Sequence, residues 1–92
     1  MTDLPLGVSA IVVSWHTGPR LYDCLNALAM SQEIDETIVV DNGNTKGERA
    51  RLDAWAREDA RLSVHRGQGN VGFARGCNLG ATRARGQRLL FI

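Results

Sequence analysis

Two short segments carry the residues best suited to chemistry. The first is the apolar run Ile38-Val39-Val40, which ends at Asp41-Asn42-Gly43. The second is the glycine-rich segment 70–78, Asn-Val-Gly-Phe-Ala-Arg-Gly-Cys-Asn. In open α/β sheets ligands collect at the carboxyl ends of strands, and the amide groups at a helix N-terminus attract phosphate. The two segments together therefore indicate a nucleotide site.

Asp41 is the residue with the most specific chemistry. A carboxylate accepts hydrogen bonds but cannot donate them, so it suits the N3 proton of uracil or thymine, or the N1 and N2 protons of guanine. It is poorly matched to the acceptor-rich edge of adenine. The sequence thus favours uridine, thymidine or guanosine nucleotides. The structural alternative is that Asp41 only caps the Asn42-Gly43 turn.

Ser14-Trp15-His16 follows the first predicted strand and reaches the same edge of the sheet. We expect this turn to line a base or ribose, with the Trp15 indole as a packing surface. The alternative is that Trp15 packs in the core or against a loop. Neither His16 nor His65 is a convincing acid–base group, so the sequence predicts no catalytic residue.

Gly72 opens a predicted helix whose free amide groups attract phosphate oxygens. Arg75 could add a bidentate contact to a phosphate or a base, and Asn78 is expected near the same helix face. The alternative is that Arg75 is a solvated surface residue and that the glycines only permit close contact between helix and sheet.

Residues 67–72 also match the dinucleotide pattern G-x-G-x-x-G. That pattern belongs to the first βα turn of its fold and needs an acid about 20 residues later. Here it follows the third predicted strand, and no Asp or Glu occurs after Asp59. A nicotinamide or flavin site is therefore disfavoured.

The hydrophobic pattern alternates between strands and helices, which predicts a parallel α/β sheet. Thr17 is expected to cap the first helix. Trp55 lies on the second predicted helix and is expected to pack against the sheet. The predicted strands are 8–14, 37–40, 62–65 and 88–92, and the predicted helices run from about 19 to 30, from 46 to 60 and from 72 to 85.

Composition limits the chain to one domain, because 92 residues bury only a thin core. The net charge is +1, from 11 basic and 10 acidic residues, so no strong overall field attracts nucleic acid or anionic lipid. We therefore expect no nucleic-acid partner.

No apolar stretch approaches the roughly 20 residues of a membrane span, so no transmembrane segment is predicted. The first residues contain Asp3 and Pro5 and do not form a secretory signal, which predicts a cytoplasmic chain. Cys24 and Cys77 lack metal-ligand spacing and are expected to be buried free thiols.

Four segments, in this order and spacing, closely resemble the family 2 glycosyltransferases, with the rhamnosyltransferase-like branch as the nearest match. The likeness runs from residue 8 to residue 92. The segments are 8–14 with Trp15-His16, then Ile38-Val39-Val40-Asp41-Asn42, then Asn70-x-Gly72-x-Ala74-x-Gly76-x-Asn78, and finally Gly86-x-x-Leu89-Leu90-Phe91-Ile92.

The resemblance implies a GT-A fold with a Rossmann-like parallel sheet of order 3-2-1-4 and helices on both faces. It makes residues 1–92 a single truncated nucleotide-binding domain with an amino-terminal tail at 1–7, and it places Cys24 and Cys77 on opposite sides of the sheet. By resemblance Asp41 holds the base, the Ser14 turn lines the nucleoside, and Gly72 with Arg75 faces the nucleoside or diphosphate. The implied nucleotide-binding residues are Ser14, Trp15, His16, Asp41, Asn42, Gly72, Arg75 and Asn78.

The resemblance also implies an inverting transferase that moves a sugar from a UDP-, dTDP- or GDP-sugar to a glycan or lipid-linked acceptor in polysaccharide biosynthesis. In the family an acidic motif after the fourth strand binds Mg²⁺ or Mn²⁺, and a later Asp or Glu acts as the base. A parent protein that is peripheral on the inner face of the membrane fits the same resemblance.

The sequence stops at Ile92 within a predicted central strand. We therefore expect this chain to hold the nucleotide-binding half, to bind no metal or cofactor by itself, and to be inactive alone. A strand with an unpaired edge is also expected to cause self-association, disorder of the last residues, or pairing with another chain. The functional alternatives are a non-catalytic nucleotide-binding module and a Rossmann-type NAD-binding fragment.

Overall fold

The structure of the chain is a computed structural model that describes residues 6–92. Strands and helices alternate throughout, as predicted. The elements are β1 (Leu6–Trp15), α1 (Arg20–Met30), β2 (Glu36–Gly43), α2 (Lys46–Glu58), β3 (Leu62–His65), α3 (Gly72–Arg83) and β4 (Gly86–Phe91).

Most boundaries differ from the prediction by one to three residues. β1 begins at Leu6, so residues 6 and 7 belong to the strand and not to the predicted tail; the rest of that tail, 1–5, lies outside the described residues. β2 extends from Glu36 to Gly43 because its polar ends also pair with β1. β3 has the predicted bounds.

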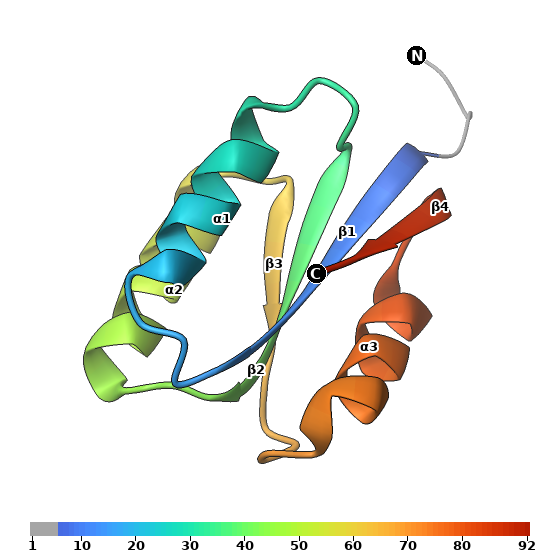
Figure 1. Cartoon of the computed structure of the whole chain (residues 1–92). Coiled ribbons are helices and arrows are strands. Elements are labelled where there is room, and N and C mark those ends of the chain that lie inside the picture. The colour runs from blue at the N-terminus through green and yellow to red at the C-terminus, as the bar shows by residue number, and fades with distance from the viewer. Residues whose placement is uncertain (1–5) are drawn as a thin grey trace.

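The four strands form one parallel sheet in the order β3-β2-β1-β4, which confirms the predicted order. Helices α1 and α2 cover one face, and α3 covers the other (Figure 1). Right-handed crossovers between parallel strands require this arrangement once the winding reverses after β3. The β1–β2 register sets Ser14 opposite Asp41, at the end where both strands leave the sheet.

The core has two layers because successive strand residues point to opposite faces. The larger layer joins Ala10, Val12 and Val39 to the apolar stripes of α1 and α2, and the half-buried Trp55 packs against it, as predicted. The smaller layer under α3 is built from Ile11, Ile38 and Val40.

Two glycines let α3 approach the sheet closely. A Cβ atom at Gly76 would lie 2.8 Å from Val13 Cγ1, and one at Gly80 would overlap Ile11. Both glycines are buried. The predicted alternative, in which glycines serve close contact between helix and sheet, is therefore confirmed at these two positions.

Cys24 and Cys77 are both free thiols and lie on helices that cover opposite faces of the sheet, as predicted. They are half-buried and not fully buried. Burial raises the pKa of both thiols. Among residues 6–92, no helix combines the length and the apolar character that crossing a bilayer requires.

The outer edge of β4 pairs with no other described strand. Both faces of this strand carry apolar side chains that are 41–46 % exposed: Leu89, Leu90 and Phe91, with Ile92 just beyond. The self-association predicted from this edge stays a prediction.

At the amino edge of the sheet, the buried carboxylate of Glu36 ties β2 to the start of β4. Glu36 Oε2 accepts hydrogen bonds from Ser9 Oγ and from the Arg85 amide, each at 2.5 Å. The Gly86 amide in turn donates to Ser9 Oγ at 2.8 Å. Burial raises the pKa of Glu36, but these hydrogen bonds and the charge of Arg85 outweigh burial and hold the pKa below its usual value.

We predict that Gly80→Ala lowers the free energy of unfolding by about 1–3 kcal/mol, because the added methyl group forces α3 away from Ile11. Gly47→Ala is the matched control, since it also adds a methyl group to a helix but meets nothing within 4 Å. The control is expected to leave stability unchanged or to raise it by up to about 1 kcal/mol. Urea denaturation measures both, and equal effects would contradict the packing argument.

We predict that Glu36→Gln makes stability less dependent on acid pH. The folded pKa of Glu36 is lowered, so its contribution is present above the unfolded pKa of about 4.3 and is lost as pH falls through the folded value. The wild-type free energy of unfolding should therefore fall more steeply below about pH 5 than that of the variant. The exposed Glu33→Gln serves as control, and a variant slope equal to wild type would refute the role of Glu36.

Candidate nucleotide site

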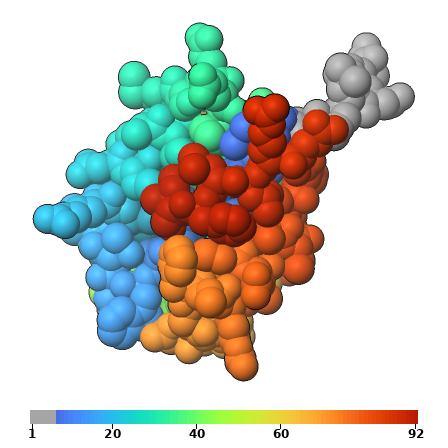
Figure 2. Space-filling model, turned by 45° about the vertical axis from the view of Figure 1, so that its right-hand side comes forward, coloured from blue at the N-terminus to red at the C-terminus, as the bar shows by residue number. Residues whose placement is uncertain are grey.

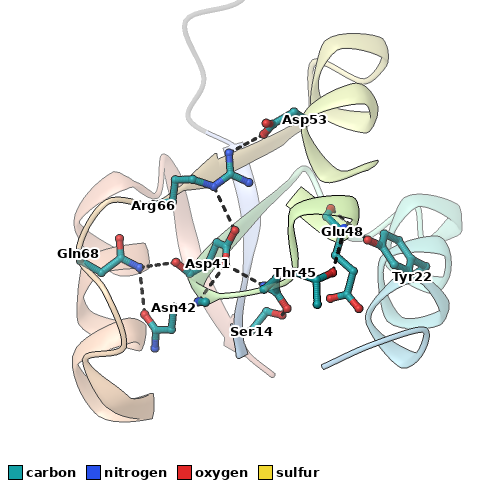
Figure 3. Close-up of polar contacts among 11 residues, drawn as sticks. Ser14, Tyr22, Asp41, Asn42, Thr45, Glu48, Asp53, Arg66 and Gln68 are labelled. Carbon is teal, nitrogen blue, oxygen red and sulfur yellow. Dashed lines mark hydrogen bonds and ion pairs between the residues drawn. The ribbon is translucent and has the colours of Figure 1, made fainter. Parts of the chain in front are cut away.

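The carboxylate of Asp41 lies at the carboxyl end of β2 and is 4 % exposed. Its Oδ1 accepts hydrogen bonds from the Gly43 amide at 3.0 Å and from Asn44 Nδ2 at 2.8 Å. Its Oδ2 accepts one from Arg66 Nε at 3.0 Å (Figure 3). The turn-capping contact considered in the sequence is present, and an ion pair that the sequence did not predict stands beside it.

Arg66 is the residue directly after β3, and its guanidinium links the end of β2 to α2. Its Nη1 donates to Asp53 Oδ1 on α2 at 2.6 Å, while its Nε donates to Asp41 (Figure 3). Burial lowers the pKa of Arg66, but the hydrogen bonds and charges of the two carboxylates outweigh it and raise the pKa. The guanidinium therefore stays charged. Its Nη2 is buried and has no hydrogen-bond partner among the described residues.

Ser14 stands behind Asp41 and does not face solvent. Its side chain is fully buried, donates to Asn44 Oδ1 at 3.2 Å, and lies 2.8 Å from Thr17 Oγ1. The Ser14 side chain therefore orients the Asn44 amide that bonds to Asp41, and the expectation that the Ser14 turn lines a nucleoside stays a prediction. Thr17 is likewise not a helix cap, since α1 follows Pro19 without a side-chain cap.

The strand pleat sends Asp41 and Asn42 to opposite faces of the sheet. Asp41 faces the side of α2, whereas Asn42 Nδ2 donates to the Gly72 carbonyl at the start of α3 at 3.1 Å. Gln68 Nε2 connects the two by donating to the Asp41 carbonyl at 2.8 Å and to Asn42 Oδ1 at 3.0 Å. These contacts fix the loop between β3 and α3 to the end of β2.

Two hollows open at this edge of the sheet, and Asn42 borders both. The hollow on the Asp41 side has a volume of about 280 Å³ and is lined by Asp41, Asn42, Gly43, Asn44, Arg49, Arg66, Gly67 and Gly69. The hollow on the α3 side has a similar volume and is lined by Val13, Trp15, Thr17, Asn42, Asn70, Gly72 and Phe73. We call them the Asp41 hollow and the Trp15 hollow.

Trp15 is 56 % exposed and lines the hollow that bears its name, so it does not pack in the core, although its contact with the Gly43 turn agrees with the alternative of packing against a loop. Its ring packs beside Gly43, where an added Cβ atom would lie 3.1 Å from the indole, and meets the His16 ring edge-on with centroids 4.7 Å apart. His16 has a φ of 46° and its amide donates to the Gly43 carbonyl at 2.7 Å. The backbone thus holds both rings at the sheet edge.

Arg75 and Asn78 lie apart from the other predicted residues. Both are exposed and line a third, apolar hollow of about 350 Å³ on the flank of α3, together with Gln68, Val71, Leu79 and Thr82. Neither lines the Asp41 hollow or the Trp15 hollow. Gly72 lines the Trp15 hollow and Arg75 lines the hollow on the flank of α3, so the expectation that both face one ligand stays a prediction.

The G-x-G-x-x-G motif lies between β3 and α3, as predicted, and not after the first strand. Gly67, Gly69 and Gly72 all have left-handed backbone angles, with φ of 105°, 72° and 84°. The motif shapes the loop that carries Gln68. Within residues 6–92 no group of three or more His, Cys, Asp or Glu side chains is arranged to hold a metal ion.

Sequence reasoning missed Arg66, Asn44 and Gln68. The available signal was topological: Arg66 directly follows the third predicted strand, whose carboxyl end must reach the same edge as Asp41 in a parallel sheet. Asn44 is within the turn that the sequence identified. No local pattern distinguishes Gln68 from an ordinary loop residue.

An open parallel α/β sheet with polar hollows at the carboxyl ends of its strands is the architecture of nucleotide-binding α/β proteins. Residues 9–92 match Glycosyl transferase family 2, and the chain therefore belongs to that family. The resemblance seen in the sequence is confirmed at this level, and its rhamnosyltransferase-like branch stays a prediction.

Among curated proteins the chain is similar to glycosyltransferase GlyG of Streptococcus pneumoniae serotype 4 (strain ATCC BAA-334 / TIGR4). The two are 28% identical over 86 residues, which make up 92% of this chain and 29% of that relative. The chain therefore spans less than a third of the relative's length.

We predict that Arg66→Met lowers the free energy of unfolding by about 1–3 kcal/mol, because it leaves the Asp41 carboxylate buried without its cation. Arg61→Met is the control, since it removes the more exposed pair with Asp59, which contributes about 0.2–1 kcal/mol. Adding Asp41→Asn to Arg66→Met should recover part of the loss. Chemical denaturation measures all of these variants, and equal losses from Arg66→Met and Arg61→Met would contradict the prediction.

Proposed function

We propose that this chain binds the nucleoside diphosphate part of a nucleotide-sugar donor, within a glycosyltransferase that transfers the sugar to a glycan or lipid-linked acceptor. Membership of family 2 supports the reaction class. The polar hollows at the carboxyl edge support the binding role, because this edge is where open α/β sheets take their ligands. Asp41 and Arg66 carry the proposal.

A count of hydrogen-bond positions supports base binding at Asp41. A carboxylate offers about four acceptor positions, two on each oxygen. Oδ1 already accepts two hydrogen bonds and Oδ2 accepts one, so one position on Oδ2 stays open. Arg66 Nη2, attached to the guanidinium that bonds to Oδ2, supplies a donor without a partner among the described residues. An acceptor and a donor are thus available side by side in one hollow.

This pair of groups favours uracil or thymine. Each of these bases has an N3 proton flanked by carbonyl oxygens, so the proton fits Asp41 Oδ2 while a carbonyl accepts from Arg66. Guanine also offers a proton beside a carbonyl, but its exocyclic amino group needs a second acceptor, and Oδ1 is already filled. Adenine and cytosine have an acceptor where Asp41 requires a proton. We therefore rank UDP and dTDP above GDP, and GDP above ADP.

The Trp15 hollow is the proposed place for the ribose and diphosphate. It shares the Asn42 wall with the Asp41 hollow, so one extended ligand can occupy both. Trp15 and Phe73 give it apolar sides, and the first turn of α3 contributes backbone amides that attract phosphate. The Gly72 amide is already bonded to Asn70 Oδ1, so the amides of the next residues would serve this role.

The sugar transfer itself is proposed to be an inverting single displacement. It needs a metal ion and a general base in addition to the donor-binding residues named above. The Mg²⁺ or Mn²⁺ ion expected from the resemblance would neutralise the departing diphosphate, but the described residues form no cluster that fits it. We therefore propose that residues 6–92 contribute binding and orientation of the donor. They are not expected to transfer sugar alone.

We predict that calorimetric titration detects UDP and dTDP binding, weaker GDP binding and no NADH binding, without a requirement for Mn²⁺. Asp41→Asn should weaken UDP binding by at least about tenfold, because an amide group places a donor where the N3 proton needs an acceptor. The matched control is Asp23→Asn on the exposed start of α1, which should bind UDP as the wild type does.

Two results would overturn this proposal. One is binding of NADH alone, which would favour a dinucleotide site. The other is a folded Asp41→Asn chain with unchanged affinity for UDP. If Asp41→Asn fails to fold, backbone amide NMR of the wild type decides the matter, since UDP must shift the signals of Asn42, Gly43, Asn44 and Gly67 and leave α1 unchanged.

A further inference from the structure

Arg49 is a charged residue of the Asp41 hollow that the fold itself does not use. It lies in the first turn of α2 and lines the hollow together with Asp41 and Arg66. Its side chain is exposed, and among residues 6–92 no carboxylate lies within ion-pair distance of it. A positive charge in the first turn also opposes the helix dipole. Helix stability therefore does not explain an arginine at this position.

The geometry of α2 brings Arg49 to the ligand edge of the sheet. The helix begins shortly after β2 ends, so its first turn lies nearest the carboxyl edge. Asp53 lies one turn further along the same helix face, where its Oδ1 accepts a hydrogen bond from Arg66 Nη1 at 2.6 Å. Arg49 therefore lies one turn closer to the edge than the residue that holds Arg66. Because Asp53 is bonded to Arg66, Arg49 is left without the acidic partner that this spacing normally provides.

Arg49 is also separated from the arginines of α3. Helices α2 and α3 cover opposite faces of the sheet (Figure 1). Figure 2 shows the α3 side, where the orange atoms of α3 and the red atoms of β4 lie together. The sheet thus stands between Arg49 and the two arginines Arg75 and Arg83. Of the two arginines that line the Asp41 hollow, Arg66 is bonded to two carboxylates and Arg49 to none among the described residues.

The edge of uracil and of thymine carries three hydrogen-bonding groups in a row. A carbonyl oxygen stands on each side of the N3 proton, so the edge presents an acceptor, a donor and an acceptor. Asp41 Oδ2 has an open position for the proton, and Arg66 Nη2 is a donor for one carbonyl. The second carbonyl needs another donor. The amides of Asn42 and Asn44 already donate to protein acceptors, which leaves Arg49 among the side chains that line the hollow.

We propose that Arg49 donates a hydrogen bond to the base carbonyl that Arg66 does not reach, and that it selects uracil or thymine against guanine. Guanine presents a carbonyl, a ring proton and an amino group in that order. Because two carboxylates hold the Arg66 guanidinium in place, guanine must direct its carbonyl there, which leaves its amino group opposite Arg49. Two donors that face each other both lose a partner, and the site rejects the base. This inference rests on the proposed function and names a residue that determines which nucleotide the site accepts.

The test is calorimetric titration of the wild type and of Arg49→Gln with UDP and with GDP. The variant removes no ion pair between described residues and is expected to fold. It should weaken UDP binding about tenfold or more, because a hydrogen bond from a charged donor is lost, and should not weaken GDP binding. The ratio of the UDP affinity to the GDP affinity should therefore fall by the same factor.

Lys46→Gln is the matched control. It removes the same charge from an exposed residue of the same helical turn, and Lys46 does not line the hollow. The control should leave the UDP-to-GDP ratio unchanged. A fall in this ratio equal to that of Arg49→Gln would show that only the overall charge matters and would sink the proposal.

The alternative role of an arginine at this place is to bind a phosphate of the ligand. Titration with uridine, followed by backbone amide NMR, separates the two roles because uridine has no phosphate. If Arg49 contacts the base, Arg49→Gln should weaken uridine binding by the same factor as UDP binding. A loss confined to UDP, or equal losses for UDP and GDP, would assign Arg49 to the phosphate and contradict the proposal.

Two sulfur analogues test the contact with a carbonyl directly. 2-thio-UDP and 4-thio-UDP each replace one carbonyl oxygen by sulfur, which is a weaker acceptor. One of the two should bind the wild type more weakly than UDP does, yet bind Arg49→Gln as tightly as UDP does, since that contact is already lost. The other should lose the same factor in both proteins. Equal losses in the two proteins for both analogues would refute the contact.

These outcomes differ from a failure of the proposed function. If the wild type binds no UDP, or if a folded Asp41→Asn chain binds it as the wild type does, the proposed function and this inference fail together. If Asp41→Asn weakens UDP binding while Arg49→Gln leaves the UDP-to-GDP ratio unchanged, only the inference about Arg49 fails.

Discussion

The carboxyl edge of this sheet depends on the buried carboxylate of Asp41. It accepts a backbone amide from its own turn, the side chain of Asn44, and the guanidinium of Arg66. Through Asn44 it is joined to Ser14 on β1, and through Arg66 to Asp53 on α2. A buried charge persists only when such partners compensate for the loss of water. These partners therefore hold the carboxylate in one orientation at the edge of the sheet.

A second constraint is the alternation of side chains along β2. Its two ends each carry a buried carboxylate, Glu36 at the amino end and Asp41 at the carboxyl end, and the odd spacing between them sends them to opposite faces. Glu36 is enclosed by Ser9 and the start of β4, and no described hollow at the carboxyl edge includes it. Of these two buried carboxylates, Glu36 therefore holds neighbouring strands together, whereas Asp41 also lines a hollow.

The close approach of α3 depends on two glycines that face the sheet. Glycine at positions 76 and 80 allows the helix to lie directly on Val13 and Ile11, which leaves the outer side of α3 free to carry Arg75 and Arg83. The other face of the sheet is covered by α1 and α2, which together carry five basic and four acidic residues.

The sequence alone determined the order of elements, the parallel sheet and the place of Asp41 at its carboxyl edge, because hydrophobic periodicity and turn residues are local properties that act over a few positions. It also identified the family. Only the tertiary structure decided that Ser14 supports Asp41 from within, that Arg75 and Asn78 line a separate hollow on the flank of α3, and that Arg66 completes the ion pair. Those outcomes depend on the pleat, on how α3 packs against the sheet and on the meeting of strand ends distant in sequence, and none of these is encoded in one short segment.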